Sequence, residues 1–88
     1  MPRPVTSPDD LFPVLSRIWR QVLELPEIGV DDDFHDLGGD SLQALVIARR
    51  LGEEGFEVMP SAVLRRPTVR RLAEAIVDPR LFTEPEPY

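Results

Sequence analysis

The stretch "DDDFHDLGGDSLQAL", residues 31–45, concentrates the side chains of this sequence that could do chemistry. In it, Ser41 follows Gly38, Gly39 and Asp40 and precedes an apolar run. A serine in this position is typical of a helix N-cap, because its hydroxyl can accept a hydrogen bond from an amide of the first turn. The two glycines allow backbone angles that other residues avoid, and they leave little bulk beside the hydroxyl, so another molecule could reach it. Taken alone, the pattern favours the cap.

A self-contained serine hydrolase is disfavoured. The only histidine, His35, stands six residues before Ser41, so a nucleophile and a base are both present on paper. A nucleophile elbow needs glycine two residues to either side of the serine, on a turn between a strand and a helix. Gly39 meets that rule, but Gln43 does not, and no strand pattern precedes the serine. We therefore interpret His35 as a loop residue that is either solvated or flanks one of the apolar anchors of the loop.

The aspartates of this stretch do not match a calcium loop. Counting an EF-hand from Asp31 puts His35 at the fifth position, Asp36 at the sixth and Leu42 at the twelfth, where an oxygen ligand, glycine and glutamate are needed. Solvation of a loop is the simpler interpretation of Asp31, Asp33 and Asp36.

A phosphate-binding loop fits no better. Gly38 and Gly39 before a helix resemble an anion-binding turn, but Asp40 and its acidic neighbours would repel an anion. The stretch also lacks the lysine of a P-loop.

Charge is segregated along the chain. The net charge is −6, with seven acids and no basic residue over residues 24–40, and six arginines against three glutamates over residues 49–71. This pattern suits either a solvated surface or docking to a charged partner. The arginines at 65, 66, 70 and 71 keep a small helical DNA-binding module as an alternative from another class, although the net negative charge disfavours nucleic acid as a partner.

Composition limits the remaining classes. The 88 residues fit one domain, and the absence of cysteine excludes a disulfide framework or a zinc cluster of cysteines. The longest apolar run, Ala44 to Ala48, is too short to span a membrane, and the N-terminus has no signal-peptide pattern. We expect a soluble, cytoplasmic monomer.

The elements that must position residues 31–45 are helices. The expected elements are a helix from Asp9 or Leu11 to Leu25, a loop over 26–40, a helix from Ser41 to about Glu54, a short helical turn over 60–65, and a helix capped by Thr68 that ends before Pro79. Pro13 lacks the N–H of an interior helical position, so the first helix either begins near it or opens with an irregular turn. Ser7 is the expected cap of that start. The sequence predicts an all-α fold, a small bundle of three longer helices and one short helix with a long first loop.

The expected domain covers residues 9–78, between an N-terminal arm over 1–8 and a C-terminal tail over 79–88. The first helix is expected to bury Leu11, Leu15, Ile18, Trp19, Val22 and Leu25, helped by Phe12. The second helix is expected to bury Ala44, Leu45, Ile47, Ala48 and Leu51. Three apolar residues of the loop, Val30, Phe34 and Leu37, are expected to pin it to the core.

Two segments of the chain resemble a known family. They are "IWRQVLELPEIGVDDDFHDLGGDSLQALVIARRL", residues 18–51, and "VLRRPTVRRLAEAI", residues 63–76. The first holds an Ile-Trp pair, the pattern D-x-F-x-x-L-G-G-x-S-L and an Arg-Leu ending, and the second holds Pro-Thr-Val followed by Leu-Ala. In this order and spacing they resemble the peptidyl carrier (thiolation) domains of nonribosomal peptide synthetases, which share the acyl carrier protein-like fold.

The resemblance implies a carrier that catalyses nothing itself. A phosphopantetheinyl transferase would attach 4′-phosphopantetheine from coenzyme A to Ser41, with magnesium on the transferase side, and Gly39 and Asp40 would flank the cofactor. The thiol of this arm would hold an aminoacyl or peptidyl group as a thioester. An adenylation domain would load the arm, and condensation, thioesterase or tailoring enzymes would receive its cargo.

In this family the helix after the serine meets partner enzymes, which implies partner contacts for Leu42 and Leu45, and for Leu64 in the short helix. Core packing is the alternative for all three, and for Leu45 it is equally favoured. Polyketide-type carriers are the near alternative in function, although they usually have one glycine before the serine and lack the Ile-Trp pair. The chain starts at Met1 and ends soon after the last helix, which suits a free-standing carrier and an excised domain alike.

Overall fold

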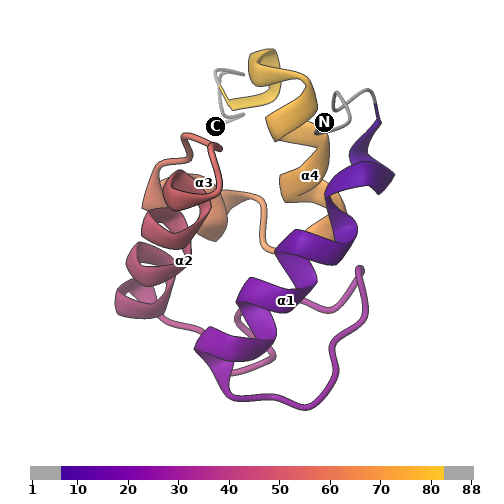
Figure 1. The fold of residues 1–88 in the computed structure, drawn as a ribbon. Coiled ribbons are helices and arrows are strands. Elements are labelled where there is room, and N and C mark those ends of the chain that lie inside the picture. Colours follow the sequence, from indigo (N-terminus) through magenta and orange to yellow (C-terminus); the bar gives the residue numbers. More distant parts are fainter. Residues whose placement is uncertain (1–6, 83–88) are drawn as a thin grey trace, which may run out of the picture.

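The computed structural model describes residues 7–82 and is helical throughout its ordered elements (Figure 1). In chain order the elements are the 3-10 helix η1 (Pro8–Leu11), α1 (Phe12–Leu23), α2 (Ser41–Glu53), α3 (Pro60–Arg65), α4 (Val69–Val77) and the 3-10 helix η2 (Pro79–Phe82). α1 packs against both α2 and α4, and α3 lies against α2. Within residues 7–82 there is no strand. The predicted all-α bundle of three longer helices and one short helix is therefore confirmed.

The predicted arm and tail fall largely on residues 1–6 and 83–88, which lie outside the described part of the chain. Between those limits, no helix is long and apolar enough to cross a membrane.

The start of the first helix accommodates Pro13 by changing helix type. Ser7 caps η1, because the N–H of Asp9 donates to the Ser7 hydroxyl over 3.1 Å. The α-helix begins only at Phe12, which puts Pro13 in its first turn, where no intrahelical partner is needed for the missing N–H. Both sequence expectations, a late start and an irregular first turn, are met.

The end of α1 corrects the prediction. The helix stops at Leu23 and not at Leu25, because Glu24 takes a left-handed conformation with φ 56°. The N–H of Leu25 then returns to the carbonyl of Arg20 over 3.0 Å, which closes the helix end. Leu25 still packs against the core, but from the loop and not from the helix.

The long loop between α1 and α2 is fastened to the start of α4. The carbonyl of Val30 accepts the N–H of Arg70 over 2.9 Å, and the carbonyl of Pro67 accepts the N–H of Phe34 over 2.6 Å. Two nitrogens of the Arg70 guanidinium also donate to the Asp31 carboxylate, over 2.7 and 3.3 Å. This hydrogen bonding holds the pKa of the Asp31 carboxyl below its usual range and raises the pKa of Arg70.

The aspartates of the loop make hydrogen bonds within the fold, which corrects their interpretation as solvated side chains. Asp31 pairs with Arg70, and Asp32 accepts the N–H of Gly29 over 2.7 Å. Asp33 accepts the N–H of His35 over 2.8 Å, which forms a short side-chain turn. The acids set the path of the loop that leads to Ser41.

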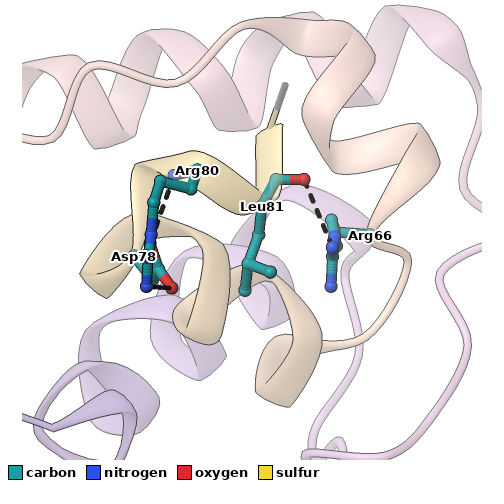
Figure 2. A network of polar contacts seen from close by, with 4 residues as sticks. All are labelled: Arg66, Asp78, Arg80 and Leu81. Atoms are coloured by element: carbon teal, nitrogen blue, oxygen red, sulfur yellow. Dashed lines mark hydrogen bonds and ion pairs between the residues drawn. The ribbon is translucent and has the colours of Figure 1, made fainter. Parts of the chain in front are cut away.

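A short turn that the sequence did not predict follows α4. Asp78 accepts hydrogen bonds from the backbone N–H and the side chain of Arg80, and Arg66 donates to the carbonyl of Leu81 over 3.2 Å (Figure 2). These contacts hold η2 beside the α3–α4 connection. Residues 79–82, expected to open the tail, are thus in a 3-10 helix that packs on α4.

Candidate functional site

Ser41 is the first residue of α2, and it is exposed. The residue before it, Asp40, is the N-cap: its carboxylate accepts the N–H of Gln43 over 2.9 Å. The Gln43 side chain accepts the N–H of Asp40 in return, over 3.1 Å, which completes a capping box. The interpretation of Ser41 as the cap is therefore wrong. Within residues 7–82, the Ser41 hydroxyl makes no hydrogen bond, so a reaction at this hydroxyl would not have to break one in this region.

Removing the cap should weaken α2 without removing the serine. We expect Asp40→Ala to lower the free energy of unfolding by about 1 kcal/mol, because the first-turn N–H of Gln43 loses its acceptor. Asp40→Asn is the matched control, since asparagine caps about as well as aspartate. Urea denaturation followed by circular dichroism measures both, and equal losses in the two variants would contradict the capping role.

The two glycines before Asp40 are needed for different reasons. Gly38 has φ +91°, a conformation that side chains rarely adopt, and a Cβ added there would meet nothing within 4 Å. Gly39 does not have a positive φ, contrary to the expectation that both glycines supply unusual backbone angles. A Cβ added at Gly39 would instead overlap the Cζ, Cε1 and Cε2 atoms of Phe34. Gly39 is required because the ring of Phe34 lies directly against its backbone.

His35 is exposed, and its ring interacts with residues other than Ser41. Its ring packs edge-on to Phe34, with ring centroids 5.7 Å apart, and its Nε2 lies 3.5 Å from the carbonyl oxygen of Leu64. In the described residues no hydrogen bond joins it to Ser41. The arrangement has no base on the serine, so Ser41 is displayed and not activated.

The described residues bring together no group of three metal-ligating side chains. The aspartates of the loop point to Arg70 and to backbone N–H groups instead, as described above.

Exposed apolar side chains lie on and near α2. Leu42 and Leu45 are 67% and 43% exposed, whereas Leu64 is half-buried and packs against the core. The placement of Leu45 on the buried face is wrong: at 3.6 residues per turn it lies about 120° around the helix from Leu51. Met59, 72% exposed, was missed by the sequence analysis. It is the N-cap residue of α3 and belongs to no periodic pattern.

The core beneath the site is aromatic. Trp19 of α1 and Phe34 of the loop are both fully buried, with ring centroids 5.3 Å apart and ring planes at 70°. The indole N–H of Trp19 has no hydrogen-bond acceptor within the described chain. Of the three predicted loop anchors, Phe34 is fully buried, while Val30 and Leu37 are half-buried against the same core.

Comparison with known proteins places this chain in a family. Residues 13–76 match the family described as "Phosphopantetheine attachment site". One of the plipastatin synthase proteins of Bacillus subtilis (strain 168) is 39% identical over 71 residues, which is 80% of this chain and 3% of that protein. Gramicidin S synthase 1 of Brevibacillus brevis is 33% identical over 76 residues, which is 86% of this chain and 7% of that protein. The chain spans only a few per cent of the length of the first curated relatives that it matches.

Solved structures agree with the fold and with the family. A "Non Ribosomal PCP domain" is 34% identical, with a TM-score of 0.69 over 84% of this chain and 92% of that one. A chain from a complex of the phosphopantetheine transferase Sfp with coenzyme A and a peptidyl carrier protein is 28% identical, with a TM-score of 0.70 over 85% and 92%.

Proposed function

Since this chain belongs to the phosphopantetheine attachment family, and within it to the peptidyl carrier domains, we propose that Ser41 is the residue that receives 4′-phosphopantetheine. One observation carries the assignment. Asp40 caps α2 in place of the serine, so the Ser41 hydroxyl is exposed at a fixed position and has no hydrogen bond of its own within residues 7–82.

The surroundings of Ser41 suit a phosphodiester. The N-terminal end of a 13-residue helix carries partial positive charge and N–H groups without intrahelical partners. Asp40, the nearest carboxylate in sequence, is already engaged with the N–H of Gln43. Gly39 and Asp40 would therefore flank the attached group as a compact turn. The negative charge of the Asp40 carboxylate would stay directed at the N–H of Gln43, at the N-terminal end of α2.

The attachment balances as a displacement at phosphorus. Ser41 Oγ attacks the pyrophosphate of coenzyme A, the new Oγ–P bond forms, and the P–O bond to adenosine 3′,5′-bisphosphate breaks, with the electron pair leaving on that nucleotide. The serine proton needs a base. Among the described residues no hydrogen bond joins His35 to Ser41, so we assign the base, and the magnesium ion, to the transferase.

The attached arm supplies a terminal thiol that holds an aminoacyl or peptidyl group as a thioester. The chain itself has no cysteine, and within residues 7–82 no base is hydrogen-bonded to the serine, which supports the proposal that the chain is modified and carries cargo and is not itself an enzyme. An adenylation domain would load the arm, and condensation, thioesterase or tailoring enzymes would receive the cargo. We place the carrier in the cytoplasm, where coenzyme A is available, as a monomer of net charge −6.

The other candidate functions have less support. Arg70 is paired with Asp31, and Arg66 donates to the carbonyl of Leu81. Two of the four arginines that would form a DNA-binding surface therefore already interact with other residues of this chain. The relatives named in the comparisons are peptide synthases, which favours peptidyl over polyketide cargo.

The direct test is modification in solution. We expect the protein, incubated with coenzyme A, magnesium and Sfp, to gain one phosphopantetheine group per chain in an intact-mass measurement. A protein that stays unmodified under conditions that modify a known carrier would refute the proposal. Salt-sensitive binding to duplex DNA would support the DNA-binding alternative instead.

We also propose that Leu42, Leu45 and Leu64 contact partner enzymes, beginning with the transferase. Leu42 is the most exposed of the three and adjoins Ser41. Leu42→Asp should lower kcat/KM of the Sfp reaction by about tenfold or more, because burying a leucine contributes about 1.5–3 kcal/mol and about 1.4 kcal/mol is tenfold.

Gly52→Asp is the matched control for this variant. It adds the same charge to the same helix at an exposed position with no atom within 4 Å of an added Cβ. It also lies about 15 Å further along α2, at about 1.5 Å per residue. Similar losses in the two variants would show a general charge effect and contradict a contact at Leu42.

A further inference from the structure

The ring of Phe34 lies directly against the backbone that leads to Ser41. A Cβ at Gly39 would overlap Cζ, Cε1 and Cε2, the three atoms at the far end of the ring. The N–H of Gly39 also donates to the carbonyl of Phe34 over 2.9 Å. Residues 34–39 thus form a closed turn, and the end of the aromatic ring lies against the backbone of its last residue.

This ring is held by parts of the fold other than α2. Its edge-to-face partner is Trp19 of α1, and the N–H of Phe34 donates to the carbonyl of Pro67, just before α4. Phe34 is fully buried, so its ring is enclosed by other atoms of the protein. The position of Gly39 is therefore set by α1 and by the α3–α4 connection, through one side chain.

Only Asp40 separates Gly39 from Ser41. Asp40 is extended, with φ −135° and ψ −179°, and its capping box fixes the first turn of α2. A shift of Gly39 away from the ring would move Asp40 and then the serine hydroxyl. Reactions of this kind are sensitive to such shifts, because misplacing a reacting group by about 1 Å can slow a reaction about a hundredfold.

We propose that Phe34 is a positioning residue for modification of Ser41, acting through the contact between its ring and Gly39. The inference rests on the proposed attachment at Ser41. It separates two properties of the carrier: Leu42 and Leu45 govern how tightly the transferase is met, and the Phe34–Gly39 contact governs how fast the serine reacts once the complex has formed.

The geometry permits a size-swap test, because leucine lacks the three ring atoms that a Cβ at Gly39 would strike. Gly39→Ala keeps the ring and adds the clash, and Phe34→Leu removes the ring and leaves Gly39 unsupported. The double variant places the new methyl group in the space that the ring vacated. The measurements are the single-turnover rate of phosphopantetheine transfer by Sfp at saturating carrier, and the carrier concentration that gives half of that rate.

Each single variant is expected to react about tenfold more slowly, with the half-saturating concentration within about twofold of wild type, because the exposed leucines are unchanged. The double variant is expected to recover to within about threefold of the wild-type rate. A residue that merely stabilised the fold would give additive losses and no recovery. All rates are compared at a temperature where circular dichroism shows each variant to be folded.

Gly38→Ala is the matched control. It changes the neighbouring glycine, but its penalty comes from the positive φ and not from the ring, so Phe34→Leu should not rescue it. If Gly39→Ala does not fold, Phe34→Leu and the double variant carry the test, and the double must react faster than Phe34→Leu.

Three results would overturn the inference: a wild-type rate for folded Phe34→Leu, a double variant no faster than the slower single, or equal rescue of Gly38→Ala. An unmodified wild-type protein would refute the proposed attachment itself, so the two failures are distinguishable.

Discussion

Ser41→Ala is expected to abolish phosphopantetheine transfer to this protein. With coenzyme A, magnesium and Sfp, the wild-type chain should gain one adduct and the variant none, because no hydroxyl group remains at the start of α2. The substitution should leave the fold intact, since the Ser41 hydroxyl makes no hydrogen bond within residues 7–82 and Asp40 still caps the helix. Alanine also favours a helix. Intact-mass measurement and a thermal unfolding curve check the two halves of this prediction.

Ser61→Ala provides the control. Ser61 is also exposed and also lies in the first turn of a helix, α3, but it lacks the Gly-Gly-Asp approach of Ser41. This variant should be modified as the wild type is. An adduct that persists in Ser41→Ala, or disappears in Ser61→Ala, would place the attachment elsewhere.

Trp19→Ala should have the largest effect on stability. Truncating a buried tryptophan costs about 3–5 kcal/mol. A domain of this size is stable by roughly 4–13 kcal/mol, so the loss is a large part of the total. Trp19 is fully buried and supports the ring of Phe34, so the cavity would open beneath the loop that leads to Ser41. Urea denaturation followed by circular dichroism would measure the loss.

Trp19→Phe should be far milder, with a change within about 1.5 kcal/mol. The smaller ring loses buried apolar area, but it also removes an indole N–H that has no acceptor in the described chain, and such a group costs about 1–3 kcal/mol when buried. The two effects oppose each other. A loss in Trp19→Phe as large as in Trp19→Ala would show that the indole finds a partner in solution.

The elements with strong local signals could be predicted from the sequence. Pro60 opens α3 at the expected residue, and Thr68 caps α4 by accepting the N–H of Arg71 over 3.0 Å. The role of Phe34 as an anchor of the loop could also be predicted, since it is an isolated aromatic residue among acids. The end of α1 could not, because glutamate is an unusual residue for the left-handed conformation that Glu24 adopts.

The N-cap of α2 could have been identified from the sequence. Asp40 and Ser41 are both good capping residues, and only one of them has a glutamine three positions later to complete the box. Gln43 therefore distinguishes Asp40 from Ser41 on the sequence alone. The contact of Gly39 with Phe34 could not be foreseen, because it depends on how Trp19 and Pro67 place the ring.

The fastening of the loop to α4 has a consequence for how this protein is made. Val30 and Phe34 bond to Arg70 and Pro67, and Asp31 reaches Arg70 across 39 positions of sequence. These partners leave the ribosome well after Ser41 does, so the segment before the serine lacks its final supports while synthesis continues. Long-range contacts of this kind form late, because the intervening chain must first be ordered. A nascent chain that ends before α4 would thus carry the serine without the contacts from Pro67 and Arg70 that fix the loop before it.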